Sequence, residues 1–266
     1  MFFVGVDLAW SENNPSGFAV IEGDNKGGEL VSLDLLVTDD EIKESIEKNV
    51  AGEDAIVAVD APLLVPNETG RRPAEEFVGK LFRKYDAGAH PANRRRFVEW
   101  TGRVRGEDIV EELESIGFNH DPRIEKGKTC RKVVEVYPHP SMVVLFELDK
   151  ILQYKNKPGR DYGDLWEEFR RYQKKLEALE NRSPSLKLPE EIVGKEVESV
   201  KGKELKNYED KLDAIFCAYI AHYCWVKPEM CAVLGNTEEG YILTPVKEEM
   251  REKVEELKSQ KKLNSF

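Results

Sequence analysis

The pattern of apolar and polar positions begins with three predicted strands. Residues 2–9 are almost entirely apolar, as in a buried strand, and residues 18–23 form a second apolar stretch after the turn-forming NNPSG. Residues 29–37 alternate between apolar and polar side chains, which is typical of a strand with one covered face. Because only short polar turns separate the three segments, the sequence predicts an antiparallel meander.

A helix and a fourth strand follow the meander. Thr38 has Glu41 three residues after it, which is the pattern of a capping box, so a helix is expected from Thr38 to about Asn49. Residues 54–63 then form a continuous apolar run, typical of a parallel strand that is covered on both faces. The predicted order is therefore β-β-β-α-β.

Two segments interrupt the pattern of strands. Residues 64–130 contain scattered Pro and Gly with charged helical pieces and no strand-like apolar run, so we expect an inserted segment that is mainly helical and basic. A buried strand resumes over 132–140, and a short helix is expected over 141–148. The second insertion, 151–206, is polar and charged, with one amphipathic helix predicted over 164–180.

The last part of the chain returns to apolar elements. A strongly buried helix is predicted over 208–226, followed by a strand pair at 233–236 and 240–246. The C-terminal tail, 247–266, is charged, and its helix, expected to end at residue 263, is predicted to be exposed. We therefore expect one α/β domain over residues 1–266, carrying two insertions and this tail.

Composition and charge narrow the class of protein. Hydrophobic residues make up 40% and charged residues 34% of the chain, which supports a real core and excludes a disordered chain. The longest apolar stretch, 214–226, is too short to span a bilayer, and the N-terminus has no basic region typical of a signal peptide. A net charge of -11 excludes a general coat for nucleic acid. The four cysteines form no CxxC pair, so we expect reduced thiols in a cytoplasmic protein: Cys130, Cys217, Cys224 and Cys231.

Four acids stand where an unpaired carboxylate would be costly. Asp7 ends the apolar run VGVD, Asp60 ends IVAVD, and Glu135 lies within VVEVY. Asp213 lies on the apolar face of the predicted helix 208–226. Because burying an unpaired carboxylate costs several kcal/mol, such residues are paired, protonated or bound to a cation.

A shared cation satisfies these acids if the first and fourth predicted strands are neighbours. Adjacent strands lie about 4.8 Å apart, so Asp7 and Asp60 could bridge one Mg²⁺ or Mn²⁺ ion, with Glu135 and Asp213 available for a second. Other interpretations stay open. Loop N–H groups could satisfy the strand-end acids, and Arg131 or another base could form a salt bridge with Glu135. Asp210, expected in the first turn of its helix together with Asp213, could serve the helix dipole alone.

The segments VGVDLAW (4–10), VAVDAPL (57–63), VEVYPHP (134–140), DKLDAIFCAYIA (210–221) and GYILTP (240–245) occur in one order along the chain. Taken together, they resemble the family of unknown function number 429 (DUF429), whose members are predicted to be RNase H-like nucleases. The resemblance implies a mixed five-stranded sheet of order 3-2-1-4-5 with flanking helices. It also implies a metal-dependent nuclease with acidic roles for Asp7, Asp60, Glu135 and Asp213.

The first insertion carries a local excess of positive charge. Between residues 71 and 105 lie ten Lys or Arg and only four Asp or Glu residues. This segment follows Asp60, so its cations are candidates for phosphate contacts and its aromatic rings for base stacking, unless those rings pack into the core. The candidate cations are Arg71, Arg72, Arg83, Lys84, Arg94, Arg95 and Arg96, and the candidate rings are Phe82, Tyr85, Phe97 and Trp100. His139 is a further candidate for orienting a phosphate, or a plain loop residue.

The leading hypothesis is a divalent-metal-dependent phosphodiesterase or nuclease acting on nucleic acid or a nucleotide. An actin-like or sugar-kinase-like phosphotransferase shares the β-β-β-α-β start, but the turn after the first strand lacks a glycine-rich phosphate loop. A non-catalytic RNase H-like binding protein is the third possibility. The sequence contains no P-loop, GxSxG or GxGxxG motif, which argues against P-loop NTPase, serine hydrolase and dinucleotide chemistry.

Overall fold

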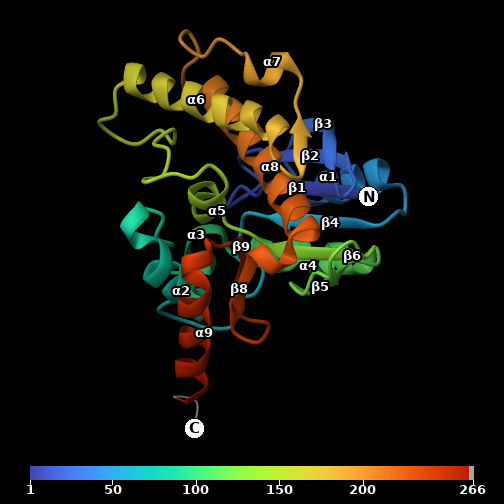
Figure 1. Cartoon of the computed structure of the whole chain (residues 1–266), viewed down its shortest axis with the longest axis vertical. Helices are drawn as coiled ribbons and strands as arrows, with labels where there is room; N and C mark the ends of the chain where they lie inside the picture. Colours follow the sequence, from blue (N-terminus) through green and yellow to red (C-terminus); the bar gives the residue numbers. More distant parts are fainter. Residues whose placement is uncertain (264–266) are drawn as a thin grey trace.

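The N-terminal order β-β-β-α-β is present in the computed structural model, which describes residues 1–263 and the side chains of residues 1–260 (Figure 1). Strands β1 (Phe2–Asp7), β2 (Ser16–Gly23) and β3 (Gly27–Leu36) form the expected antiparallel meander. Helix α1 (Asp39–Val50) has Thr38 as its N-cap with the predicted capping box, and β4 (Ala55–Val59) then pairs in parallel with β1. The local pattern therefore predicted this half of the sheet correctly.

The sheet has seven strands and not the five that were expected. Its order is β5-β6-β4-β1-β2-β3-β7. The central strands β3-β2-β1-β4-β6 keep the expected order, with β6 (Arg131–Glu135) as the fifth. The additional edge strands are β5 (Asn119–His120) and β7 (Ser185–Lys187), which lie inside the two predicted insertions. Strands of two and three residues carry no readable periodicity, and their neighbours β6 and β3 decide that they pair.

Helices cover both faces of this sheet. Helix α8 (Gly202–Val226) lies across β1 and β2 on one face, where α5 (Pro138–Leu145) and α6 (Tyr162–Glu177) join the same apolar core. Helices α1 and α4 (Arg105–Ser115) cover the opposite face. Because β-strand side chains alternate between the two faces, the central strands β1, β2, β4 and β6 contribute residues to both cores.

A third apolar cluster holds the remaining elements together. It joins α2 (Pro73–Phe82), the hairpin β8–β9 (Cys231–Asn236 and Gly240–Pro245) and α9 (Glu248–Leu263). The expectation of an exposed α9 is therefore wrong, because its residues at helical spacing, Met250, Val254 and Leu257, are buried against α2 and the hairpin. The short elements are α3 (Arg94–Thr101), α7 (Glu190–Val193) and 3₁₀ turns at Arg83–Tyr85, Ala178–Asn181 and Pro228–Met230.

Helix α8 also begins earlier than expected. It starts at Gly202, so Asp210 and Asp213 lie well inside the helix and not in its first turn. Residues 203–208 (KELKNY), which lie between Gly202 and the two aspartates, are mostly good helix formers, and this lets the helix begin earlier. Among the described residues, no helix is both long and apolar enough to cross a membrane. The four cysteines are free thiols, and Cys217 and Cys224 are buried on α8.

Two glycines allow α8 to approach the sheet closely. A Cβ atom on Gly5 of β1 would lie 2.0 Å from the carbonyl oxygen of Ala214, and one on Gly17 of β2 would lie 1.9 Å from that of Asp210. Both obstacles are helix backbone, which has no other rotamer to adopt. Any larger side chain must therefore push the helix off the sheet.

We expect Gly5→Ala to destabilise the protein by about 2–3 kcal/mol, because overpacking of this kind displaces backbone. Urea denaturation of the variant and the wild type measures the difference. Gly79→Ala on α2 is the matched control, because a Cβ there has no neighbour within 4 Å and alanine favours the helix by about 0.5–1 kcal/mol. Equal stability of Gly5→Ala and wild type would contradict the close packing of α8.

Candidate functional site

Asp7 and Asp60 lie side by side at the C-terminal ends of the neighbouring central strands β1 and β4. Val6 stands opposite Val59 in the parallel β1–β4 pair, and the backbone N–H of Asp60 donates to the carbonyl of Val6 over 2.9 Å. Gly5 faces α8 and Ala58 belongs to the core on that face, so alternation turns Asp7 and Asp60 toward α8 as well. The expected pair of strand-end acids is therefore formed.

Neither carboxylate of this pair makes a hydrogen bond or ion pair with the described residues. Burial, with smaller contributions from the charges of Asp213 and Glu135, raises the pKa of Asp60 to about 7, although Lys155 lowers it. Burial also raises the pKa of Asp7 well above its usual value, again against the effect of Lys155. Both acids therefore bind protons more readily than free aspartates do, which is the state expected of buried carboxylates without a cation.

Asp213 reaches the same place from α8 but is already fully paired. Its side chain is completely buried, and it accepts hydrogen bonds from Tyr154 Oη at 2.7 Å and Tyr172 Oη at 3.1 Å. The ammonium of Lys155 donates to its second oxygen and lies 3.2 Å from Glu209. Lys155 thus places a positive charge where the sequence predicted a metal ion.

Glu135 belongs to a different ion-pair cluster. It stands in register with Val59, whose side chain lies in the core of the opposite face, so Glu135 turns away from Asp60. Arg72 donates to both carboxylate oxygens of Glu135, at 2.6 and 2.8 Å, and to Glu75 at 2.8 Å, while the Leu63 N–H also donates to Glu135. All three charged side chains are buried, and together they form what we call the buried triad: Arg72, Glu75 and Glu135.

A cleft of about 740 Å³ opens beside Asp7 and Asp60. Its walls come from the loop after β1, the first insertion, the end of β6 and the start of α8. Polar and charged residues at these positions include Asp7, Asn14, Asp60, His90, Lys155, Lys203, Lys206, Asn207 and Asp210, and the aromatic ones are Trp10, Phe97 and Tyr137. The two acids without a hydrogen-bond partner therefore share one concave site with cations and aromatic rings.

Residues 5–239 match the family described as "Protein of unknown function (DUF429)", which is most of the chain. The chain belongs to this family. No curated protein matches it.

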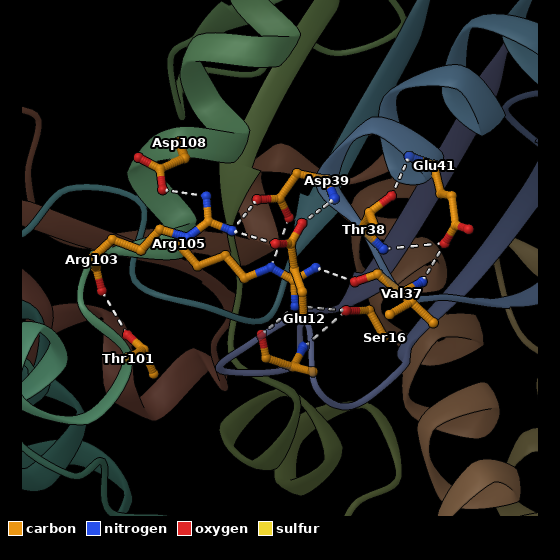
Figure 2. Close-up of polar contacts among 11 residues, drawn as sticks. Glu12, Ser16, Val37, Thr38, Asp39, Glu41, Thr101, Arg103, Arg105 and Asp108 are labelled. Carbon is orange, nitrogen blue, oxygen red and sulfur yellow. Dashed lines mark hydrogen bonds and ion pairs between the residues drawn. The ribbon is translucent and has the colours of Figure 1, made fainter.

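In this DUF429 protein an arginine that the sequence did not single out fixes the loop after β1. Arg105, at the start of α4, donates to Asp39 at 2.7 Å, to the carbonyl of Ala9 at 2.7 Å and to that of Val37 at 2.9 Å (Figure 2). Arg103 donates to the other oxygen of Asp39 over 2.7 Å. Because this network joins β1, α1 and α4, it holds the chain that leaves Asp7 in one position. The sequence around Arg105, TGRVRGED, is mostly polar and charged, so no local pattern marked this arginine as a buried one.

The candidate phosphate contacts of the DUF429 protein fall into three groups. Arg72 is buried in the triad, and Arg94 and Arg95 are paired with Glu107 and Glu99. Arg96 lies over the ring of Trp100 at 4.1 Å. Arg71, Arg83 and Lys84 are exposed and do not line the cleft.

The candidate stacking rings differ in their exposure to solvent. Phe82, Tyr85 and Phe97 are buried in apolar clusters, as the alternative interpretation had it, and Trp100 is exposed. Trp10, which was not a candidate, lines the cleft and is exposed too. His139 lies outside the cleft lining; burial, aided by Lys155, lowers its pKa to about 4, and its Nδ1 is buried without a partner.

Fewer acids are available as metal ligands than the sequence suggested. Within the described side chains, no group of three or more His, Cys, Asp or Glu residues is placed so that it could hold a metal ion. The four predicted acids are thus not brought together as one ligand set: Arg72 occupies Glu135, and Lys155 and two tyrosines occupy Asp213. Asp7 and Asp60, which make no hydrogen bond with the described residues, remain as hard oxygen donors of the kind that Mg²⁺ and Mn²⁺ prefer.

Proposed function

We propose that this DUF429 protein is an RNase H-like, divalent-cation-dependent phosphodiesterase or nuclease. The observation that carries the proposal is the pair Asp7 and Asp60, two half-buried residues at the ends of neighbouring parallel strands, whose carboxylates face a cleft and have no hydrogen-bond partner among the described residues. The central strand order 3-2-1-4-6, with α8 across β1, supports the RNase H-like assignment.

Asp7 and Asp60 would hold one cation between them, and Asp213 would act indirectly. A divalent ion at this place supplies positive charge for a phosphate and makes a bound water a better nucleophile. Asp213 keeps the ammonium of Lys155 beside the two acids, and Tyr154 and Tyr172 fix the orientation of Asp213. In this arrangement Lys155 contributes a second positive charge for an anionic substrate.

Lys155 also favours one other candidate function. The ammonium of Lys155 compensates part of the negative charge of the surrounding acids, as a metal ion would. A protein that relies on this ammonium needs no divalent cation. Such a chain would bind nucleic acid or nucleotides on an RNase H-like fold without cleaving them. The dependence on a divalent cation separates the two functions.

We expect saturating Mn²⁺ to stabilise the protein by about 2–3 kcal/mol at a hundredfold excess over its dissociation constant, because the ion binds only the folded chain. Urea denaturation with and without Mn²⁺ measures this stabilisation. The same protein is then incubated with labelled single-stranded, double-stranded and branched nucleic acids. Asp7→Asn should abolish the Mn²⁺ effect and reduce cleavage by more than about 100-fold, since it removes a direct ligand and not an outer partner.

Asp34→Asn serves as the matched control, because Asp34 is an exposed acid on β3 outside the cleft lining. It should keep both the Mn²⁺ stabilisation and the cleavage. Cleavage that is the same in Asp7→Asn and wild type, or no Mn²⁺ effect and no cleavage at all, would rule out the hydrolase and leave the binding function.

A further inference from the structure

Two exposed tryptophans and one buried phenylalanine form an aromatic cluster at the mouth of the cleft. Trp10 stacks on Phe97 with the ring centroids 5.2 Å apart, and Trp100 lies 5.5 Å from Trp10 at a tilted angle. Trp10 is 55% and Trp100 is 56% exposed, although side chains of this size are usually buried for the most part. We call these three residues the tryptophan platform. It brings together rings from the loop after β1 and from α3.

The platform is held in place and is next to the proposed cation pair. Trp10 follows Asp7 by three residues and lines the same cleft. Its neighbour Ala9 is anchored at both backbone groups, because its N–H donates to Ser16 Oγ at 3.0 Å and its carbonyl accepts from Arg105. The ring of Trp10 is therefore attached to a fixed backbone. A ligand that stacks on this ring does not have to order the loop, so the entropic cost of binding is small.

Polar groups near the platform have unused hydrogen-bonding capacity. Arg96 stacks on Trp100, donates one hydrogen bond to the Pro91 carbonyl at 3.4 Å and makes no ion pair with the described residues, although its neighbours Arg94 and Arg95 do. Asn14 and Asn207 line the cleft, and their amide groups make no hydrogen bond within the described chain. An amide side chain offers a donor and an acceptor, which suits the edge of a nucleobase, and a guanidinium suits a phosphate.

We propose that the tryptophan platform binds an unstacked base of a single-stranded nucleic acid, so that the adjacent phosphate lies in the cleft near Asp7 and Asp60. This names the substrate class of the proposed hydrolase and rests on that function. A flat aromatic ring, a free cation and free amides match the three parts of a nucleotide, whereas an apolar protein segment would leave the cation and amides unpaired. A cleft of about 740 Å³ is large enough for a nucleotide-sized ligand.

The test measures binding without cleavage. Fluorescence anisotropy in EDTA compares a labelled single-stranded hexanucleotide with an abasic chain of the same length and charge. We expect the wild type to bind the hexanucleotide about tenfold more tightly than the abasic chain, because stacking on an aromatic side chain contributes about that factor per base. Trp10→Ala should bind both probes equally, and Arg96→Ala should weaken both and reduce the slope of log K against log salt by about 0.7.

Two control variants keep the test decisive. Trp10→Phe retains a ring and should keep most of the preference for bases even if Trp10→Ala folds poorly. Val31→Ala removes a side chain that is exposed on β3, outside the cleft lining, and should match the wild type. The inference is overturned if the wild type does not bind, if it binds both probes equally, or if Trp10→Ala retains the preference.

The two proposals fail separately. Asp60→Asn should bind the hexanucleotide at least as tightly as the wild type and should not cleave it in Mn²⁺, because it removes a negative charge but not the platform. Base-dependent binding without any cleavage by the wild type overturns the hydrolase alone. Cleavage without any preference for bases overturns the platform alone.

Discussion

Replacing Arg72 by methionine is expected to destabilise the protein by about 3–5 kcal/mol at neutral pH. Arg72 is 1% exposed and is the shared partner of two carboxylates, Glu75 and Glu135, that are themselves buried. Methionine fills a similar volume, so the loss measures the charge and not a cavity. Without the guanidinium, two buried carboxylates face each other with no compensating cation. Removal of one member of a buried ion pair destabilises a protein far more than replacement of the whole pair by apolar residues.

Urea denaturation of Arg72→Met at pH 8 and pH 5 measures this loss. The loss should shrink at the lower pH, because burial raises the pKa of Glu135, and this carboxylate takes up a proton there and loses its charge. Arg72→Lys is the control: it keeps a positive charge but not the fork that contacts both oxygens of Glu135, so a smaller loss is expected. A destabilisation of Arg72→Met below about 1 kcal/mol would show that the buried triad does not support the fold.

Asp60→Asn is expected to stabilise the cation-free protein, by up to about 4 kcal/mol above pH 7. The pKa of Asp60 rises from 3.8 in the unfolded chain to about 7 in the folded one. As the pH rises from about 4 to 7, the unfolded chain releases this proton before the folded one does, so stability is progressively lost. The loss is complete above pH 7 and absent below pH 4, and an uncharged asparagine removes it.

The difference in stability between Asp60→Asn and wild type, measured in EDTA from pH 4 to 9, reports the titration of Asp60 together with its coupling to Asp7, because groups that do not interact with Asp60 cancel. It should be near zero at pH 4 and largest at pH 8. A difference that does not change with pH would mean that Asp60 is not a buried acid of raised pKa. The pKa of Asp7 is shifted in the same direction, so Asp7 should add to the loss of stability of the wild type as the pH rises.

The sequence predicted the elements that depend on neighbouring residues, such as helix caps and apolar strands. The capping box of Thr38 placed the start of α1, and the apolar runs that end at Asp7 and Asp60 placed both acids at one edge of the sheet. The same patterns gave no sign of β7, because its three residues are a strand only through their partner β3. The buried side of α9 was readable from the spacing of Met250, Val254 and Leu257 but was outweighed by the surrounding charge.

The occupants of the site could not be predicted, because they come from distant segments. Lys155 lies in a polar loop that resembles any exposed segment, yet its ammonium contacts Asp213. Arg72 was expected on a phosphate-binding surface and is instead the partner of Glu135. Glu135 was expected within its strand as a further metal ligand beside Asp60, and only the register with Val59 shows that it turns to the opposite face.

The packing of α8 on β1 and β2 has a consequence for how the chain is made. Synthesis begins at the N-terminus, so the apolar strands around Asp7 and Asp60 leave the ribosome long before α8 exists to cover them. Until then both aspartates are hydrated and ionised, and charges at the ends of apolar strands hinder aggregation. The two acids thus act as gatekeepers for the nascent sheet, and their raised affinity for protons arises only when α8 completes the fold.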